Sequence, residues 1–205
     1  MTDLIITNNE DNFQDIAEQK RLLRKQLRAM RRALTREEVE TASSAAAQRV
    51  IALPEFQKAE LILSYMSAKN ELDAAKINEA ARAMGKRVAF PLCIENGGLR
   101  LLVPRSPDAF NTGSYGILEP DPERSDEVTP GELGLIIVPA VAFDEGRRRL
   151  GQGGGYYDRL LEKTQAVTVG VGYDFQLVES LPLEPHDRAL DIVALPSALI
   201  REING

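Results

Sequence analysis

The densest group of residues suited to chemistry is a glycine-rich segment, residues 151–155, which reads Gly-Gln-Gly-Gly-Gly. It follows an apolar run, Leu135–Pro139, and three consecutive arginines at 147–149. Glycines let backbone N–H groups approach an anion closely, and the start of a helix adds a partial positive charge. The arginines can neutralise phosphate, and Asp158 stands where a magnesium ligand could project. The pattern predicts a phosphate-binding loop between a buried strand and a helix that begins near Tyr156.

The spacing of these glycines matches neither of the common nucleotide-binding motifs. A Walker A loop would close with Lys-Ser or Lys-Thr, and a dinucleotide fingerprint would space its glycines as G-x-G-x-x-G. A flexible surface turn therefore remains an alternative interpretation of the glycines on their own.

A second group of charges lies near the N-terminus, where the stretch from Lys20 to Arg36 holds eight basic residues and no acidic one. Lys20 and Arg24 are one helical turn apart. They lie beside an apolar stripe that predicts an amphipathic helix, formed by Leu23, Leu27, Met30 and Leu34. From spacing alone they fit a solvated basic face, and the arginines at 28, 32 and 36 are predicted to form that face.

The elements that must position these groups alternate between strands and helices. Strands are predicted at 61–66, 88–91, 99–103, 135–139, 167–171 and 191–195. Helices are predicted from a Thr35–Glu38 capping box to about 53, over 72–84 with Gly85 as terminator, and over 156–163. Asn-Gly at 96–97 predicts a hairpin, and 104–131 is predicted to be a loop. This order favours an α/β fold with a mostly parallel sheet covered by helices on both faces.

The chain is predicted to form one domain, 18–205, after a flexible acidic leader, 1–17, that becomes helical near residues 13–16. Its 25 Lys and Arg against 31 Asp and Glu give a net charge of −6, which disfavours nucleic-acid and membrane-surface binding. We expect a cytoplasmic protein, because no signal peptide or membrane-spanning apolar run is visible. The single cysteine, Cys93, cannot form an internal disulfide and is predicted to pack in the core. His186 is predicted to be structural.

The glycine-rich segment also carries a family resemblance. Pro139, Ala142-Phe143-Asp144, Gly146, Leu150-Gly151 and Gly153 through Asp158 resemble the signature of the 5-formyltetrahydrofolate cyclo-ligase family. Weaker matches follow in family order over residues 18–196: Lys20-Arg21-x-x-Arg24, Glu71 after the first strand, Tyr115-Gly116-Ile117-x-Glu119-Pro120, and His186-Asp187-x-x-x-Leu190-Asp191.

The resemblance implies a Rossmann-like sheet of the sugar-phosphate isomerase and CoA-transferase group. It also implies an ATP- and Mg²⁺-dependent conversion of 5-formyltetrahydrofolate, with or without a polyglutamate chain, to 5,10-methenyltetrahydrofolate with release of ADP and phosphate, through an N5-iminium phosphate. We expect a monomer rather than an oligomer.

The resemblance further implies roles for individual residues. ATP would be bound by Lys20, Arg24, Arg149, Gly151, Gln152, Gly153, Gly154, Gly155, Tyr156 and Tyr157, of which Arg149 and Tyr157 would be catalytic. The folate would be bound by Met66, Glu71, Tyr115, Gly153, Gly154, Gly155 and Tyr156, and magnesium by Asp158 and Asp191. Gln152 and Gly154 occupy positions where relatives can carry a basic side chain, which leaves nucleotide affinity and preference open.

Two alternatives remain at this stage. A phosphosugar isomerase-like enzyme would share the sheet, but it would need a general-base carboxylate and no ATP. A non-catalytic paralogue would bind folate or nucleotide for regulation.

Overall fold

A large mixed sheet forms the centre of the molecule in the computed structural model, which describes residues 9–94, 98–113, 116–182 and 188–202. Within these residues the sheet has eight strands in the order β13-β12-β10-β7-β1-β2-β3-β6. Their bounds are β13 (Leu199–Arg201), β12 (Ile192–Ala194), β10 (Val167–Val171), β7 (Leu135–Pro139), β1 (Leu61–Leu63), β2 (Arg87–Cys93), β3 (Leu99–Pro104) and β6 (Ser125–Val128). The strands from β12 to β2 are parallel, and β13, β3 and β6 are antiparallel to their neighbours.

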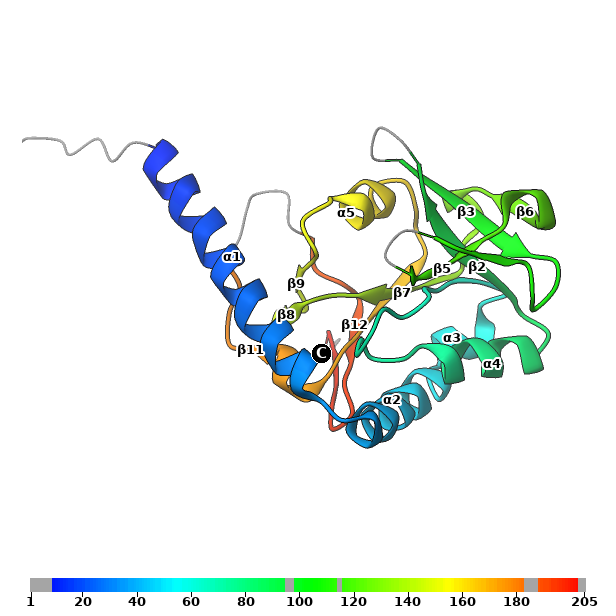
Figure 1. The fold of residues 1–205 in the computed structure, drawn as a ribbon, viewed down its shortest axis with the longest axis horizontal. Helices are drawn as coiled ribbons and strands as arrows, with labels where there is room; N and C mark the ends of the chain where they lie inside the picture. The colour runs from blue at the N-terminus through cyan, green and yellow to red at the C-terminus, as the bar shows by residue number, and fades with distance from the viewer. Residues whose placement is uncertain (1–8, 95–97, 114–115, 183–187, 203–205) are drawn as a thin grey trace, which may run out of the picture.

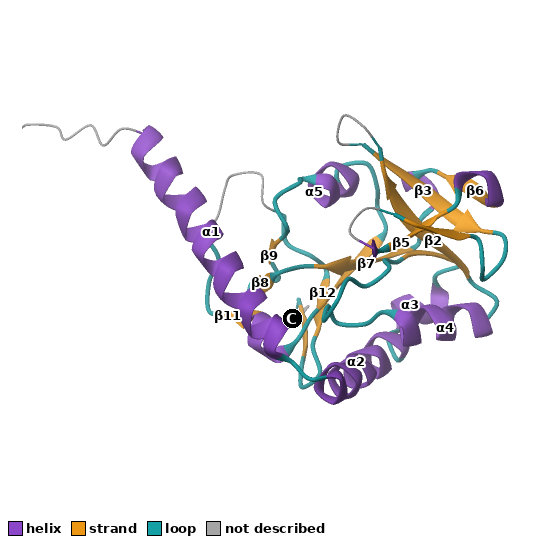
Figure 2. Cartoon of the chain, viewed as in Figure 1, coloured by secondary structure: helices purple, strands orange, loops and turns teal. Residues whose placement is uncertain are grey.

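Helices lie on both faces of this sheet and along one end of it (Figure 1). One face is covered by α2 (Arg36–Ile51), α3 (Pro54–Lys58) and α4 (Ala75–Ala83), and the other carries α5 (Tyr156–Leu161). The long helix α1 (Asn9–Ala33) runs beside a small sheet of β8 (Ala142–Asp144), β9 (Arg149–Leu150) and β11 (Leu177–Val178). The remaining elements given for the described residues are the β4 (Phe110–Thr112) and β5 (Leu118–Pro120) pair and short 3₁₀ turns at Pro122–Arg124, Pro130–Glu132 and Asp174–Gln176. Figure 2 distinguishes the helices, strands and loops by colour.

The core is divided by the sheet into two layers. In β7, Leu135 and Ile137 pack under α2 and α4, whereas Ile136 and Val138 pack toward α5. All four side chains are fully buried. A strand covered on both faces reads as a continuous apolar run, which is why this one is visible in the sequence. Each such side chain contributes about 1.5–3 kcal/mol by burial.

The predicted start of α2 is confirmed. Glu38 N–H donates to Thr35 Oγ1 at 3.2 Å, and Thr35 N–H donates to Glu38 Oε2 at 2.7 Å, which is a complete capping box. Gly85 ends α4 with φ of +73°, a conformation that glycine adopts without strain.

Three expectations about boundaries are corrected. Residues 104–131 hold β4, β5 and β6 rather than a continuous loop. The strand β6 was not visible because its two central residues, Asp126 and Glu127, are exposed at the sheet edge and break the apolar pattern. The helix α1 begins at Asn9, earlier than predicted, and α3 starts at Pro54 where the preceding helix was expected to end. In the part of the chain that the structure describes, no helix is long and apolar enough to cross a membrane.

Candidate active site

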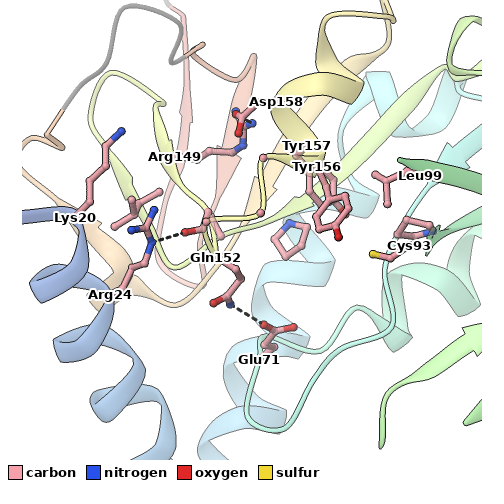
Figure 3. Close-up of a pocket in the computed structure, with 18 residues that line it drawn as sticks. Lys20, Arg24, Glu71, Cys93, Leu99, Arg149, Gln152, Tyr156, Tyr157 and Asp158 are labelled. Carbon is pink, nitrogen blue, oxygen red and sulfur yellow. Dashed lines mark hydrogen bonds and ion pairs between the residues drawn. The ribbon is translucent and has the colours of Figure 1, made fainter. Parts of the chain in front are cut away.

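A cavity of about 350 Å³ opens between α1 and the carboxyl ends of the parallel strands (Figure 3). Pro139 and Ala140 at the end of β7 form part of its floor, and α1, β2, β9 and α5 contribute side chains to its walls. The lining residues are Lys20, Arg24, Glu71, Pro91, Cys93, Leu99, Pro139, Ala140, Arg149, Leu150, Gly151, Gln152, Gly153, Gly154, Gly155, Tyr156, Tyr157 and Asp158. Binding sites in parallel sheets commonly lie at this edge.

The glycine-rich loop, residues 151–155, forms one side of the cavity. Gly153 has φ of +106° and Gly155 has φ of +67°, so both occupy the region that favours glycine. Gly155 immediately precedes α5. The two glycines therefore set the path of the loop, and a side chain at either position would strain the backbone.

Helix α1 brings cationic side chains to this loop. The Lys20 side chain is largely buried, and Arg24 Nε donates to Gly151 O at 2.9 Å. Arg28, predicted to be solvated, instead donates from Nε to Gln152 Oε1 at 3.1 Å. The face of α1 that carries residues 20, 24 and 28 is therefore turned toward the site.

Arg149 precedes the glycine-rich loop and Asp158 follows it, and the two side chains form an ion pair. The Arg149 side chain is only 5% exposed, whereas the Asp158 side chain is 46% exposed. Both residues line the cavity, so a ligand there would meet the carboxylate and the guanidinium together.

The neighbouring arginines do not share this position. Arg147 Nε donates to Leu190 O at 3.0 Å, and Arg148 forms an ion pair with the buried Asp144. Neither residue lines the cavity. The expectation that all three arginines could face a phosphate is corrected, because the turn between β8 and β9 directs two of them into structural contacts.

The opposite side of the cavity is formed by the Glu71 loop, which we define as residues 66–73. Glu71 Oε1 accepts from Arg31 Nη1 at 3.0 Å and from Gln152 Nε2 at 3.4 Å, and its Oε2 accepts from Ala68 N–H at 3.1 Å. Sequence reasoning did not single out Arg31. The available signal was the spacing of residues 24, 28 and 31, which places them on one face of a helix.

At the start of α5 the cavity wall is formed by Tyr156 and Tyr157, together with Cys93 from β2. Burial raises the pKa of the Tyr157 hydroxyl, and the nearby Glu71 carboxylate raises it further. Tyr157 is therefore neutral at physiological pH. Cys93 is exposed and lines the cavity beside Tyr156, so the prediction of a core cysteine is wrong. Partial desolvation raises the pKa of its thiol.

Several predicted site residues lie elsewhere. Met66 does not line the cavity and packs, half-buried, against the core under α2 and α4. Asp191 precedes β12, and its Oδ2 accepts from both the backbone N–H and the hydroxyl of Thr168, each at 2.8 Å. The predicted roles of Tyr115 and His186 concern positions outside the described residues.

The sheet register places Asp191 away from the cavity floor. In the register of the sheet Val169 pairs with Ile192, and Val171 pairs with Pro139. Asp191 therefore lies beside the amino-terminal half of β10, about three residues or roughly 10 Å along the strands from the cavity floor. Among the described residues, no group of three or more His, Cys, Asp or Glu side chains could hold a metal.

Fold and cavity together define an α/β protein with a ligand site at the carboxyl edge of its parallel strands, a glycine-rich loop and charges of both signs. Residues 16–196 match the model of the 5-formyltetrahydrofolate cyclo-ligase family. The chain belongs to this family and is an enzyme of the cyclo-ligase class.

Named relatives agree with this assignment. A 5-formyltetrahydrofolate cyclo-ligase of Escherichia coli K12 is 36% identical over 176 residues, covering 83% of this chain and 97% of the relative. A probable enzyme of the same name from Schizosaccharomyces pombe is 31% identical and covers 80% and 89%. The solved 5,10-methenyltetrahydrofolate synthetase of Aquifex aeolicus superposes with a TM-score of 0.80 at 33% identity, covering 91% of this chain and 94% of that one.

Proposed function

We propose that the chain converts 5-formyltetrahydrofolate to 5,10-methenyltetrahydrofolate in a reaction that consumes ATP and requires Mg²⁺. The observation that carries this proposal is the arrangement of charges across one cavity. Lys20, Arg24 and Arg149 surround the glycine-rich loop at one side, and the Glu71 carboxylate lies at the other. A triphosphate fits the first side, and a ligand with paired N–H donors fits the second.

At the triphosphate side, the chain would act through position and charge. Phosphoryl transfer depends on holding the reactants in line and neutralising the transferred group, rather than on a protein nucleophile. Lys20, Arg24 and Arg149 supply three cations, and the glycine-rich loop lets the phosphates approach its backbone closely. Arg149 is the strongest candidate for a catalytic cation, because its burial limits screening by water.

Asp158 is a fitting ligand for magnesium. Its carboxylate is half-exposed at the cavity wall, and Mg²⁺ commonly binds one or two protein carboxylates together with phosphate oxygens and water. When bound, the ion would supply additional positive charge at the phosphates. The ion pair with Arg149 holds the Asp158 carboxylate at the cavity until then.

At the folate side, Glu71 would accept hydrogen bonds from the pterin N3–H and 2-amino group. Pro91, Leu99 and Tyr156 supply apolar surface beside it. The neutral Tyr157 hydroxyl can donate to an oxygen of the phosphoryl group as it is transferred between the two sides, which is the catalytic role proposed for it.

The proposed reaction has two steps, phosphoryl transfer to the formyl oxygen and then ring closure. The formyl oxygen attacks the γ-phosphorus as the bond to the ADP oxygen breaks, which gives the N5-iminium phosphate. N10 then attacks the formyl carbon and loses its proton, and the carbon–oxygen bond breaks with release of phosphate. A poor leaving group, an amide oxygen, is thereby replaced by phosphate.

The test is a spectrophotometric turnover assay that follows the methenyl product from 5-formyltetrahydrofolate, with ATP and Mg²⁺ each included or omitted. We expect product only when both are present. Product formed equally without ATP would contradict the proposal. An absence of turnover combined with folate or nucleotide binding in calorimetry would favour the non-catalytic alternative.

A further inference from the structure

We propose that Arg31 is a positioning residue that fixes the Glu71 carboxylate in the orientation needed by the folate. This inference rests on the proposed function, in which Glu71 binds the substrate. Arg31 does not line the cavity, so it would act through Glu71 rather than by touching the substrate.

The contact between the two residues is short and shielded. Arg31 Nη1 lies 3.0 Å from Glu71 Oε1, and the side chains are 15% and 16% exposed. An ion pair at this depth is screened less by water and salt than the exposed pairs of the surface. It therefore restrains the rotation of the Glu71 carboxylate.

The backbone gives the pair a fixed frame. Asn70, directly before Glu71, has φ of +58°, and its Nδ2 lies 3.2 Å from Arg31 O and 3.2 Å from Leu34 O at the end of α1. The Tyr173 hydroxyl donates to Asn70 O at 3.2 Å. The Glu71 loop is thus attached to the end of α1 through Asn70 as well as through Arg31.

The acceptor capacity of Glu71 shows which contact a substrate would replace. A carboxylate has about four acceptor positions. Three are in use, by Arg31, by Ala68 N–H and by Gln152 Nε2. A ligand with two parallel donors needs two positions, so one existing contact must be released. The Gln152 contact is the longest at 3.4 Å and comes from an exposed side chain of the cavity wall. Gln152 would yield its place, while Arg31 stays and holds the carboxylate.

The experiment compares steady-state KM values for 5-formyltetrahydrofolate and for ATP in the full chain and in five variants: Arg31→Met, Arg31→Lys, Arg32→Met, Glu71→Gln and the Arg31→Met/Glu71→Gln double variant. Arg32 is the matched control, because it is the next residue of α1, is exposed, and donates to Arg28 O within the helix.

We expect Arg31→Met to raise the KM for the folate about tenfold and to change the KM for ATP less than twofold, since only the folate side loses a charge-assisted contact. Arg31→Lys retains the charge and should give a smaller rise, and Arg32→Met should give none. In the double variant, Arg31→Met should add nothing to the effect of Glu71→Gln.

The outcomes distinguish a wrong role for Arg31 from a wrong assignment of Glu71 to the folate. A raised folate KM for Glu71→Gln with an unchanged one for Arg31→Met overturns the role of Arg31 alone. Additive effects in the double variant, or equal rises in both KM values, overturn it as well. An unchanged folate KM for Glu71→Gln overturns the assignment of the folate side in the proposed function, and the role of Arg31 with it. If Arg31→Met does not fold, as judged by its thermal melt, Arg31→Lys and its double variant with Glu71→Gln carry the same comparison.

Discussion

The glycine-rich loop and the Glu71 loop face each other across one cavity, yet they are held in different ways. The first owes its path to two glycines with positive φ, at 153 and 155, and its middle is exposed. The second is held by side chains: Asn70 and Glu71 contact α1, and the Tyr65 hydroxyl donates to Leu72 O at 2.6 Å. One loop is thus shaped by local backbone conformation, and the other by contacts with distant parts of the chain.

The largest effect should come from adding a side chain to the glycine-rich loop. Gly153→Val forces a β-branched residue to φ of +106° and should reduce kcat/KM on the order of 100-fold by displacing the loop from the phosphates. Gly85→Val is the matched control, because Gly85 also has positive φ and open space around it but does not line the cavity. It should lower the melting temperature without lowering turnover below that temperature. Unchanged turnover in Gly153→Val would remove the glycine-rich loop from the mechanism.

Substitutions of an intermediate size of effect should distinguish Asp158 from Asp191, which the family resemblance assigns to the same metal. Asp158→Ala should raise the Mg²⁺ concentration for half-maximal turnover about tenfold, because it removes the proposed ligand. Asp191→Ala should leave that concentration unchanged and instead lower the free energy of unfolding by about 1–2 kcal/mol, because Thr168 loses its acceptor. Magnesium titrations and denaturant melts of both variants give the answer, and a shifted Mg²⁺ requirement in Asp191→Ala would restore the sequence prediction.

The smallest effect concerns the support of the Glu71 loop and depends on pH. Burial raises the pKa of Tyr173 from 10.0 to about 12 in the folded chain. The protonated hydroxyl therefore contributes stability that is fully present below pH 10 and is lost as the pH rises toward 12. Tyr173→Phe, which loses the hydrogen bond to Asn70 O, should cost about 1 kcal/mol at pH 8. Denaturant melts should show this difference narrowing above pH 10, and a constant difference would contradict the assignment.

The same contrast explains how far the sequence could be interpreted. The buried strand β7, the capping box of α2 and the glycine-rich loop are each encoded by neighbouring residues, so composition and spacing predicted them. Arg31 is one of eight basic residues between Lys20 and Arg36, and only the packing of α1 against the Glu71 loop distinguishes it. Cys93 was expected in the core because isolated cysteines usually are buried. Its place at the end of β2, where the strand meets the cavity, depends on the tertiary arrangement.

Asp191 illustrates a further limit. The residues that resemble the family do not indicate at which end of the parallel strands each of the two aspartates, Asp158 and Asp191, will lie. That depends on strand direction and register, here the pairing of Val169 with Ile192. The resemblance assigns a metal to both aspartates, which stays a prediction, and the structure shows that Asp158 lines the cavity whereas Asp191 accepts hydrogen bonds from Thr168.

The hydrogen bond from Arg24 to Gly151 joins residues 127 positions apart in the sequence. The cavity therefore forms only after distant parts of the chain have come into contact. A chain released from synthesis residue by residue cannot assemble this site until β9 and the glycine-rich loop have emerged, so ligands can recognise only the nearly complete fold. Binding then favours the native state over every partly folded form, by RT ln(1 + [L]/Kd), or about 2.7 kcal/mol at a ligand concentration 100 times Kd. A supply of substrate would in this way also lower the fraction of the protein that is unfolded and open to proteolysis.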